Sequence, residues 1–195
     1  MQEARLGEFE KKIPKLFNYF FLIGAFLLPS AFSLATGILL ICVFYGFFIN
    51  KGYFKDSLNI IFCIASIFLI ISASIHSNFN DYLSDFRLNH SLSWIGLANW
   101  IPFFLCFWGF QPYLNSNTKR RRTEIALLTG TLPVIITGIG QSFFNWHGPM
   151  ETLNGLIIWY QRPIEGISGM TGLFNNQNYT GLWLNLIFPF CLAEI

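Results

Sequence analysis

Charged residues are scarce in this sequence. Asp, Glu, Lys and Arg make up only 11% of its 195 residues, whereas a soluble globular domain has roughly 25%. The formal net charge of +2 is also too small to indicate a nucleic-acid partner. So few charges leave little surface for water to solvate, and the composition therefore argues against a soluble domain.

Residues arranged for metal, disulfide or phosphate chemistry are lacking as well. The four cysteines do not have the paired spacing of a zinc site or a disulfide framework. They all lie inside apolar runs, and we interpret them as small buried apolar residues: Cys42, Cys63, Cys106 and Cys191. No Walker-type phosphate loop, HExxH zinc motif or nucleophile elbow is present. No metal and no cofactor are therefore expected.

Hydrophobic residues, 53% of the chain, occur in continuous blocks rather than alternating with polar ones. Each block is close to the roughly 20 residues that cross about 30 Å of hydrocarbon as a helix. Lipid offers the backbone no hydrogen-bond partners, so such segments should be α-helices. We predict an all-α, polytopic transmembrane protein with a single domain over residues 1–195. Its expected helices are 13–28, 31–49, 58–75, 94–110, 125–141 and 179–195.

The first apolar run, 17–48, fits either one tilted helix or two helices that turn at Pro29 and Ser30. With two helices, ten of the 12 Lys and Arg residues lie on one side of the membrane, whereas one helix gives an even split. The positive-inside rule therefore favours two helices, a cytoplasmic amino terminus and Pro29 in the first turn of the second helix. A signal peptide over 11–33 is the competing interpretation. The apolar run continues directly past Pro29, however, as expected for a helical hairpin.

This topology places two long loops, 76–93 and 142–178, on the outer side, together with His76, His90 and His147. The second loop is long enough to be functional. Within it, the apolar stretch 153–160 is too short to span, so we expect it to lie in the membrane interface or to re-enter the membrane.

Arg162 is the candidate binding residue of this second loop. It lies in the sequence WYQRPIEGISGMTGLFNNQN, which begins at Trp159. A guanidinium group is always charged and can bind a phosphate or carboxylate through two parallel hydrogen bonds. The alternative is structural: an interfacial arginine can reach lipid headgroups or pair with a neighbour such as Glu165.

Glycines and asparagines follow Arg162. Gly172 permits positive φ and close backbone approach, and the amides of Asn176 and Asn178 suit sugar hydroxyls. The alternative is again structural, with a polar loop in which Asn178 caps a helix that begins at Tyr179.

These residues resemble a motif of the O-antigen ligase and polymerase family of bacterial envelope enzymes. The pattern is Arg162, then Gly172-x-Phe174-x-Asn176-x-Asn178, followed directly by an apolar helix that contains Pro189. The stretches SWIGLANWIPFFLCFWGFQPYL (93–114) and GLIIWYQRPI (155–164) are similar to cyanobacterial members. Gln177 stands where the family commonly has proline.

The resemblance implies a membrane glycosyltransferase with a GT-C-like helical fold. Such enzymes act in lipopolysaccharide biosynthesis on glycans carried by undecaprenyl diphosphate, at the outer face of the bacterial inner membrane. By the resemblance, Arg162 helps hold the donor diphosphate, and Gly172, Phe174, Asn176 and Asn178 belong to the same substrate site. The family's presumed catalytic histidine lies in a later half of the protein. No histidine of this chain is therefore assigned a catalytic role.

The resemblance matches only the amino-terminal portion of a family member, and the chain ends inside its sixth apolar segment. We therefore expect a piece of a longer protein, whose carboxy-terminal half would be a partner together with lipid-linked glycan and membrane lipids. A transporter for a small solute, such as inorganic carbon, is the second functional hypothesis. A transporter usually has ionisable residues inside its spans, and here the spans are nearly uncharged.

Overall fold

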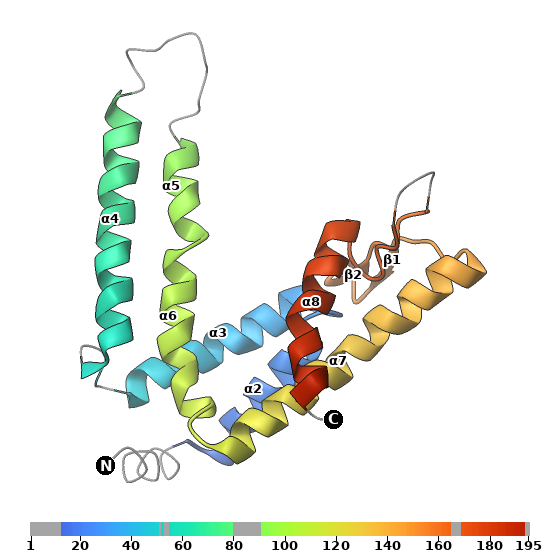
Figure 1. Ribbon diagram of the computed structural model, residues 1–195, viewed down its shortest axis with the longest axis horizontal. Helices are drawn as coiled ribbons and strands as arrows, with labels where there is room; N and C mark the ends of the chain where they lie inside the picture. The colour runs from blue at the N-terminus through green and yellow to red at the C-terminus, as the bar shows by residue number, and fades with distance from the viewer. Residues whose placement is uncertain (1–12, 51, 53–54, 80–90, 165–168, 194–195) are drawn as a thin grey trace. The chain divides into compact units, whose positions relative to one another are not determined.

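The computed structural model describes residues 13–50, 52, 55–79, 91–164 and 169–193, and these residues are mostly helical (Figure 1). The prediction of a helical protein is thus confirmed. The chain forms two compact units. The first combines Met1–Cys42 with Tyr113–Ile195, and the second is Val43–Pro112.

The first unit begins with the predicted pair of helices. Helix α2 (Lys15–Leu27) and helix α3 (Phe32–Ile49) are separated by a short turn. The Ala31 N–H closes this turn with a bond of 2.8 Å to the Leu27 carbonyl oxygen. Pro29 was expected in the first turn of the second helix, but it lies in the connecting turn, three residues before α3 begins.

Helix α7 (Asn117–Phe144) is the longest helix of the first unit and extends well beyond the predicted 125–141. Its cap is Ser116, whose hydroxyl accepts the N–H of Lys119 at 3.3 Å. The predicted span contains only the apolar part of this segment, whereas the helix also includes the basic tract 119–122. At its other end Asn145 adopts a left-handed conformation (φ 52°), and the Trp146 N–H bonds back to Gly140.

Helices α2 and α7 pack closely because one glycine lets the backbones meet. A Cβ atom on Gly130 would lie 2.2 Å from the main-chain oxygen of Phe26. Nearby, Phe21 stacks on Tyr113 with ring centroids 4.8 Å apart. Helix α8 (Gln177–Ala193) joins α7 through a bond of 3.1 Å from the Trp183 indole N–H to the Thr131 hydroxyl.

A small β-hairpin in the loop between α7 and α8 departs from the predicted all-α fold. Strands β1 (Met150–Thr152) and β2 (Ile157–Trp159) pair antiparallel, with Thr152 opposite Ile157. Asn154 and Gly155 both have positive φ, 56° and 83°, as the central residues of a type I′ turn require. The apolar stretch 153–160, which was expected to lie in the membrane interface or to re-enter the membrane, therefore contains the Asn154-Gly155 turn and strand β2 of a hairpin.

The second unit contains the end of α3, helix α4 (Ser57–Phe79), helix α5 (Ser91–Ala98) and helix α6 (Ile101–Phe110). One helix was predicted over 94–110, but the structure has a break between α5 and α6. Pro102 has no N–H, and its ring would clash with the carbonyl of Ala98 in a continuous helix. The Trp100 N–H instead bonds to Leu97, at 3.1 Å.

Aromatic and glycine contacts hold the second unit together. Phe62 of α4 stacks on Phe104 of α6 at 4.9 Å and meets Phe107 edge-on at 5.2 Å. The last turns of α3 approach α6 at two glycines. A Cβ on Gly46 would lie 2.0 Å from the main-chain oxygen of Gly109. The last residues of this unit lead into η3 (Gln111–Tyr113), a single 3₁₀ turn.

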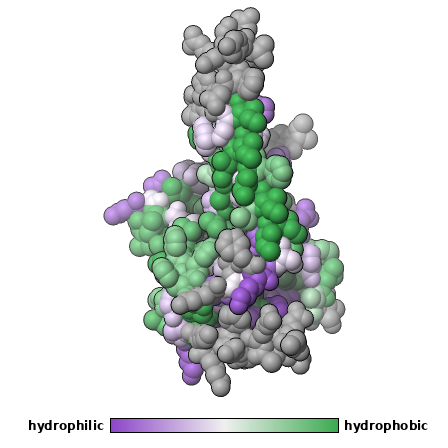
Figure 2. All heavy atoms as spheres, turned by 90° about the vertical axis from the view of Figure 1, so that its left-hand side faces the viewer, coloured by the Kyte–Doolittle hydropathy of each residue, from purple (hydrophilic) through white to green (hydrophobic). Residues whose placement is uncertain are grey.

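Three of the described helices are long and apolar enough to cross a membrane: α3, α4 over Ser57–His76, and α7. The other predicted spans form shorter helices, with 13 residues in α2, 17 in α8, and 8 and 10 in α5 and α6. The surface of α4 is apolar in Figure 2, and its exposed side chains include Ile64, Phe68 and Ile71. Exposed hydrocarbon along such long helices indicates a membrane protein.

Candidate functional site

Gln141, near the end of α7, organises the loop that carries the predicted site. Its side chain is only 2% exposed. The carboxamide oxygen accepts the N–H groups of Thr171 and Gly172, at 2.9 and 3.0 Å. The carboxamide nitrogen donates to the Thr171 hydroxyl at 3.0 Å and to the main-chain oxygen of Arg162. One side chain of a membrane-crossing helix thus binds both arms of the loop.

Thr171 is the second centre of this network. Its hydroxyl accepts the N–H of Arg162 at 3.1 Å, and its carbonyl oxygen accepts the Thr180 hydroxyl at 2.5 Å. The Tyr160 N–H also bonds to the Leu173 carbonyl, at 3.0 Å. Residues 160–162 therefore lie beside residues 171–173, and both segments are fastened to α7 and α8.

Gly172 is required at this place for two structural reasons. Its φ is +54°, a left-handed conformation that is costly for a residue with a Cβ. A Cβ would also lie 3.2 Å from the main-chain oxygen of Val134 and 3.3 Å from its side chain. Gly172 therefore brings the loop against α7, where Gln141 can bind it.

The Arg162 side chain is exposed, although its main chain is bonded on both sides. Its guanidinium group has no hydrogen-bond or ion-pair partner within the described residues. Glu165, the alternative partner weighed from the sequence, lies outside those residues. The network holds the backbone of Arg162 in place, and its side chain is exposed.

The two asparagines of the predicted site have different roles. The Asn176 side-chain oxygen accepts the N–H of Asn178 at 2.8 Å, immediately before α8 begins at Gln177. The helix cap is therefore Asn176, and the prediction that Asn178 caps a helix starting at Tyr179 is wrong. The side chain of Asn178 is exposed in the first turn of α8, where it can meet a ligand. Phe174 is half-buried in the turn closed by its N–H and the Thr171 carbonyl, at 2.9 Å.

Gln161 is fully buried next to Arg162. Its exposed fraction is 0%, and neither polar atom of its carboxamide has a hydrogen-bond partner among the residues that the structure describes. Its backbone is left-handed (φ 35°), and its main-chain oxygen accepts the Gly148 N–H at 2.9 Å. Most buried polar groups are hydrogen-bonded, so this enclosed amide is an unusual feature of the loop.

An apolar groove of about 270 Å³ lies between α7 and α8, beside Met170 of the same loop. Its wall on α7 includes Val134, Gly138 and Ser142, and its wall on α8 includes Thr180 and Leu184. Gly138 makes room here, because a Cβ at that position would lie 3.0 Å from the sulfur of Met170.

The structure offers no metal centre within the residues it describes, since no three His, Cys, Asp or Glu side chains gather there. His147 is exposed, and a ring nitrogen lies 2.9 Å from the Asn145 carbonyl oxygen. His76 is exposed in the last turn of the membrane-crossing part of α4, while His90 lies outside the described residues.

The sequence predicts Arg162 and Gly172 as site residues but does not point to Gln141 and Thr171, which connect them in the structure. Gln141 could have been noticed from the sequence, because it is the single amide near the end of an apolar span. Polar residues in membrane helices are commonly functional or bonded to one another. Comparison with protein-family models, curated proteins and solved structures finds no match for this chain.

Proposed function

We propose that this chain is a membrane glycosyltransferase component of the O-antigen ligase and polymerase type. It acts on a glycan carried by undecaprenyl diphosphate at the outer face of the bacterial inner membrane. The observation that carries the proposal is the state of Arg162. Its main chain is fixed to Gln141 and Thr171 near the end of a membrane-crossing helix, and its guanidinium group is exposed.

This state suits a diphosphate ligand. A guanidinium group binds phosphate oxygens through parallel, charge-assisted hydrogen bonds. When the glycan leaves the lipid carrier, negative charge develops on the departing diphosphate. A fixed cation there stabilises that charge without a metal. Asn178, exposed at the start of α8, adds an amide for sugar hydroxyls.

The carrier lipid also finds suitable surface beside this loop. The groove between α7 and α8 is lined mainly by apolar side chains and is flanked by Met170, next to the Thr171 network. An isoprenoid chain is apolar and gains by leaving water for such a surface. We place its first units in this groove.

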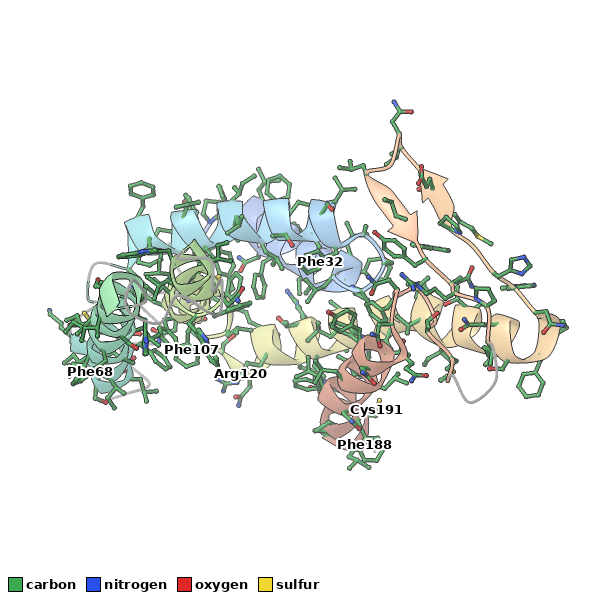
Figure 3. All side chains as sticks on the ribbon, turned by 90° about the horizontal axis from the view of Figure 1, so that it is seen from above. Phe32, Phe68, Phe107, Arg120, Phe188 and Cys191 are labelled. Atoms are coloured by element: carbon green, nitrogen blue, oxygen red, sulfur yellow. The ribbon has the colours of Figure 1, made fainter. Side chains whose placement is uncertain are left out.

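The orientation of the first unit supports an outer position for the loop. The Trp159 indole N–H donates to the Ser30 carbonyl at 2.8 Å, so the α2–α3 turn and the α7–α8 loop lie at the same end of the unit. Arg120 lies at the opposite end of α7 (Figure 3), within the tract of four cations 119–122.

Those four cations lie in the first turns of α7, where they destabilise the helix. The amino-terminal end of a helix carries partial positive charge, so cations in its first turns are unfavourable. Their position is explained by membrane orientation instead, because basic loops remain on the cytoplasmic side. The loop with Arg162 then faces outward.

A transporter remains the second candidate, but the polar groups of α7 do not favour it. The Thr131 hydroxyl bonds to the Leu127 carbonyl at 2.8 Å, and the Thr137 hydroxyl bonds to Pro133 at 2.7 Å. Gln141 is engaged by the loop. These groups satisfy the protein's own backbone and do not form a polar path for a solute.

The test is transfer of lipid-linked glycan by membranes that contain this chain as part of the longer protein that the resemblance implies, since the chain alone is expected to be inactive. Arg162→Ala should lower the transfer rate by about 100-fold, as removal of one charge-stabilising donor does. Arg162→Lys keeps the charge but loses the planar fork, so it should recover only part of the rate. Arg122→Ala, at the other end of α7, is the matched control and should leave transfer unchanged. Equal rates in wild type and Arg162→Ala would refute the assigned role.

A further inference from the structure

The β1–β2 hairpin carries exposed apolar side chains. Leu153 is 66% exposed, and Met150 and Leu156 are also exposed, at 45% and 44%. Leu153 has a φ of +54°, a conformation that leucine rarely adopts. Leu153 directly precedes the Asn-Gly turn and Leu156 directly follows it, so the tip of the hairpin carries an exposed apolar side chain on each side of the turn.

The hairpin is fastened at the level where membrane-crossing helices end. The Trp159 indole binds the α2–α3 turn through Ser30, and the Gly148 N–H binds the Gln161 carbonyl at 2.9 Å. In Figure 3 the strands run obliquely from the end of α7, at an angle to its axis. The hairpin therefore lies beside the end of α7 and the α2–α3 turn.

The end of α7 continues the same apolar surface toward the hairpin. Ile139, Phe143 and Phe144 are exposed along its last turns, and exposed Trp146 follows directly. Phe144 and Trp146 are in contact, with ring centroids 6.2 Å apart. Exposed aromatic side chains at a helix end are typical of the boundary between hydrocarbon and headgroups.

We propose that the hairpin docks into the outer bilayer surface, with Leu153 and Leu156 inserted at the boundary between headgroups and acyl chains. The occupant of this apolar surface is lipid, because the exposed apolar surface of a membrane-crossing helix leads directly to it. Charge does not oppose insertion: between Asn145 and Tyr160, Glu151 is the only acidic residue and there is no Lys or Arg. A short apolar segment at a membrane surface binds through its buried apolar area.

Insertion of the hairpin has a direct effect on its neighbour in the chain. Strand β2 leads through Tyr160 and Gln161 to Arg162, whose main chain is fixed on both sides. A tip held at the headgroup boundary therefore holds the guanidinium group at the depth of lipid phosphates. This inference does not depend on glycan transfer and applies whatever anion Arg162 binds.

The test is photolabelling of the wild-type chain in phosphatidylcholine and phosphatidylglycerol nanodiscs that contain a lipid with a diazirine near the top of one acyl chain. Mass spectrometry should locate adducts on the peptide that contains Leu153 and Leu156. A water-soluble diazirine should label His147 in preference to the tip. Tip labelling by the aqueous reagent alone, or by neither reagent, would overturn the proposal, and the latter result would indicate a protein partner.

A variant pair sharpens the result. Leu153→Asn with Leu156→Ser removes the apolar groups and keeps the turn, so acyl-chain labelling of the tip should be lost. Thr152→Ser, on the same strand, should leave it unchanged. Labelling of α4 in the same samples reports that the protein is folded in the bilayer, since its exposed isoleucines should be labelled in each variant.

Discussion

The carboxamide of Gln141 donates a hydrogen bond to the main-chain oxygen of Arg162, 21 residues further along the chain. The same side chain receives two N–H groups from the second arm of the loop. An amide is suited to this task, because its oxygen accepts and its nitrogen donates at the same time. The site therefore depends on one residue of α7 for its shape.

Replacement of Gln141 tests this dependence. Gln141→Leu leaves the N–H groups of Thr171 and Gly172 unbonded in a buried place, at a cost of about 1–3 kcal/mol each. Hydrogen exchange at these two amides should accelerate strongly. Gln141→Glu keeps the accepting oxygen and should protect them better. Gln111→Leu, in the other unit, is the control, and equal exchange in all three variants would contradict the network.

Gly172 should not tolerate a side chain. Gly172→Ala places a Cβ 3.2 Å from the Val134 oxygen in a left-handed conformation, and the conformational part alone costs about 1–2 kcal/mol. Gly155→Ala is the matched control, because its φ is also positive while nothing lies within 4 Å of its Cβ. Urea unfolding in detergent should rank Gly172→Ala below Gly155→Ala in stability. The reverse order would show that the close approach to α7 is absent.

The contact between α2 and α7 should depend on Gly130. Gly130→Ala inserts a methyl group 2.2 Å from the Phe26 carbonyl oxygen, and overpacking of this kind costs about 1–3 kcal/mol. Gly181→Ala in α8 meets nothing within 4 Å and should be neutral or stabilising, because alanine favours helix. Thermal unfolding of both variants measures the difference. Equal melting temperatures would contradict the packing.

The buried amide of Gln161 makes a prediction of the opposite sign. Gln161→Met keeps the length of the side chain and removes two polar atoms that have no partner among the described residues, so the free energy of unfolding should rise by about 1 kcal/mol. Gln141→Met, which removes a bonded amide, should lower it. A loss of stability in Gln161→Met would mean that the Gln161 amide makes bonds in the protein after all.

The orientation of the first unit is open to chemical labelling. A cysteine at the exposed Thr118, next to the basic tract, should react with an impermeant maleimide only after the inner membrane is permeabilised. A cysteine at His147 should react from the outer side in intact spheroplasts. The same cysteine-free background serves both. Labelling of Thr118→Cys in intact spheroplasts would reverse the topology and place Arg162 inside.

The helices could be predicted because their signal is local. Apolar runs of membrane length force a hydrogen-bonded helix in lipid, and the break at Pro29 followed from the balance of cations. The break before Pro102 was missed because length alone favoured one span over 94–110. The hairpin was missed because the apolar character of 153–160 hid the Asn-Gly turn signal.

The site was only partly predictable for a different reason. Arg162 and Gly172 are unusual residue types in their surroundings, so the sequence shows them. Their connection through Gln141 is a relationship between positions 21 to 31 residues apart, and no spacing rule links such positions. The cap at Asn176 rather than Asn178 depends on where α8 begins, and helix ends are the least certain part of a sequence prediction.

The bond between Trp159 and Ser30 joins positions 129 residues apart. At synthesis rates of about 5–20 residues per second, the Ser30 carbonyl exists for roughly 6 to 26 s before the indole that binds it is made. A polar main-chain group cannot stay unbonded in hydrocarbon for that time without cost. We therefore expect the tip of the first helical pair to reach water early and to exchange that water for the indole only after the later helices have been made.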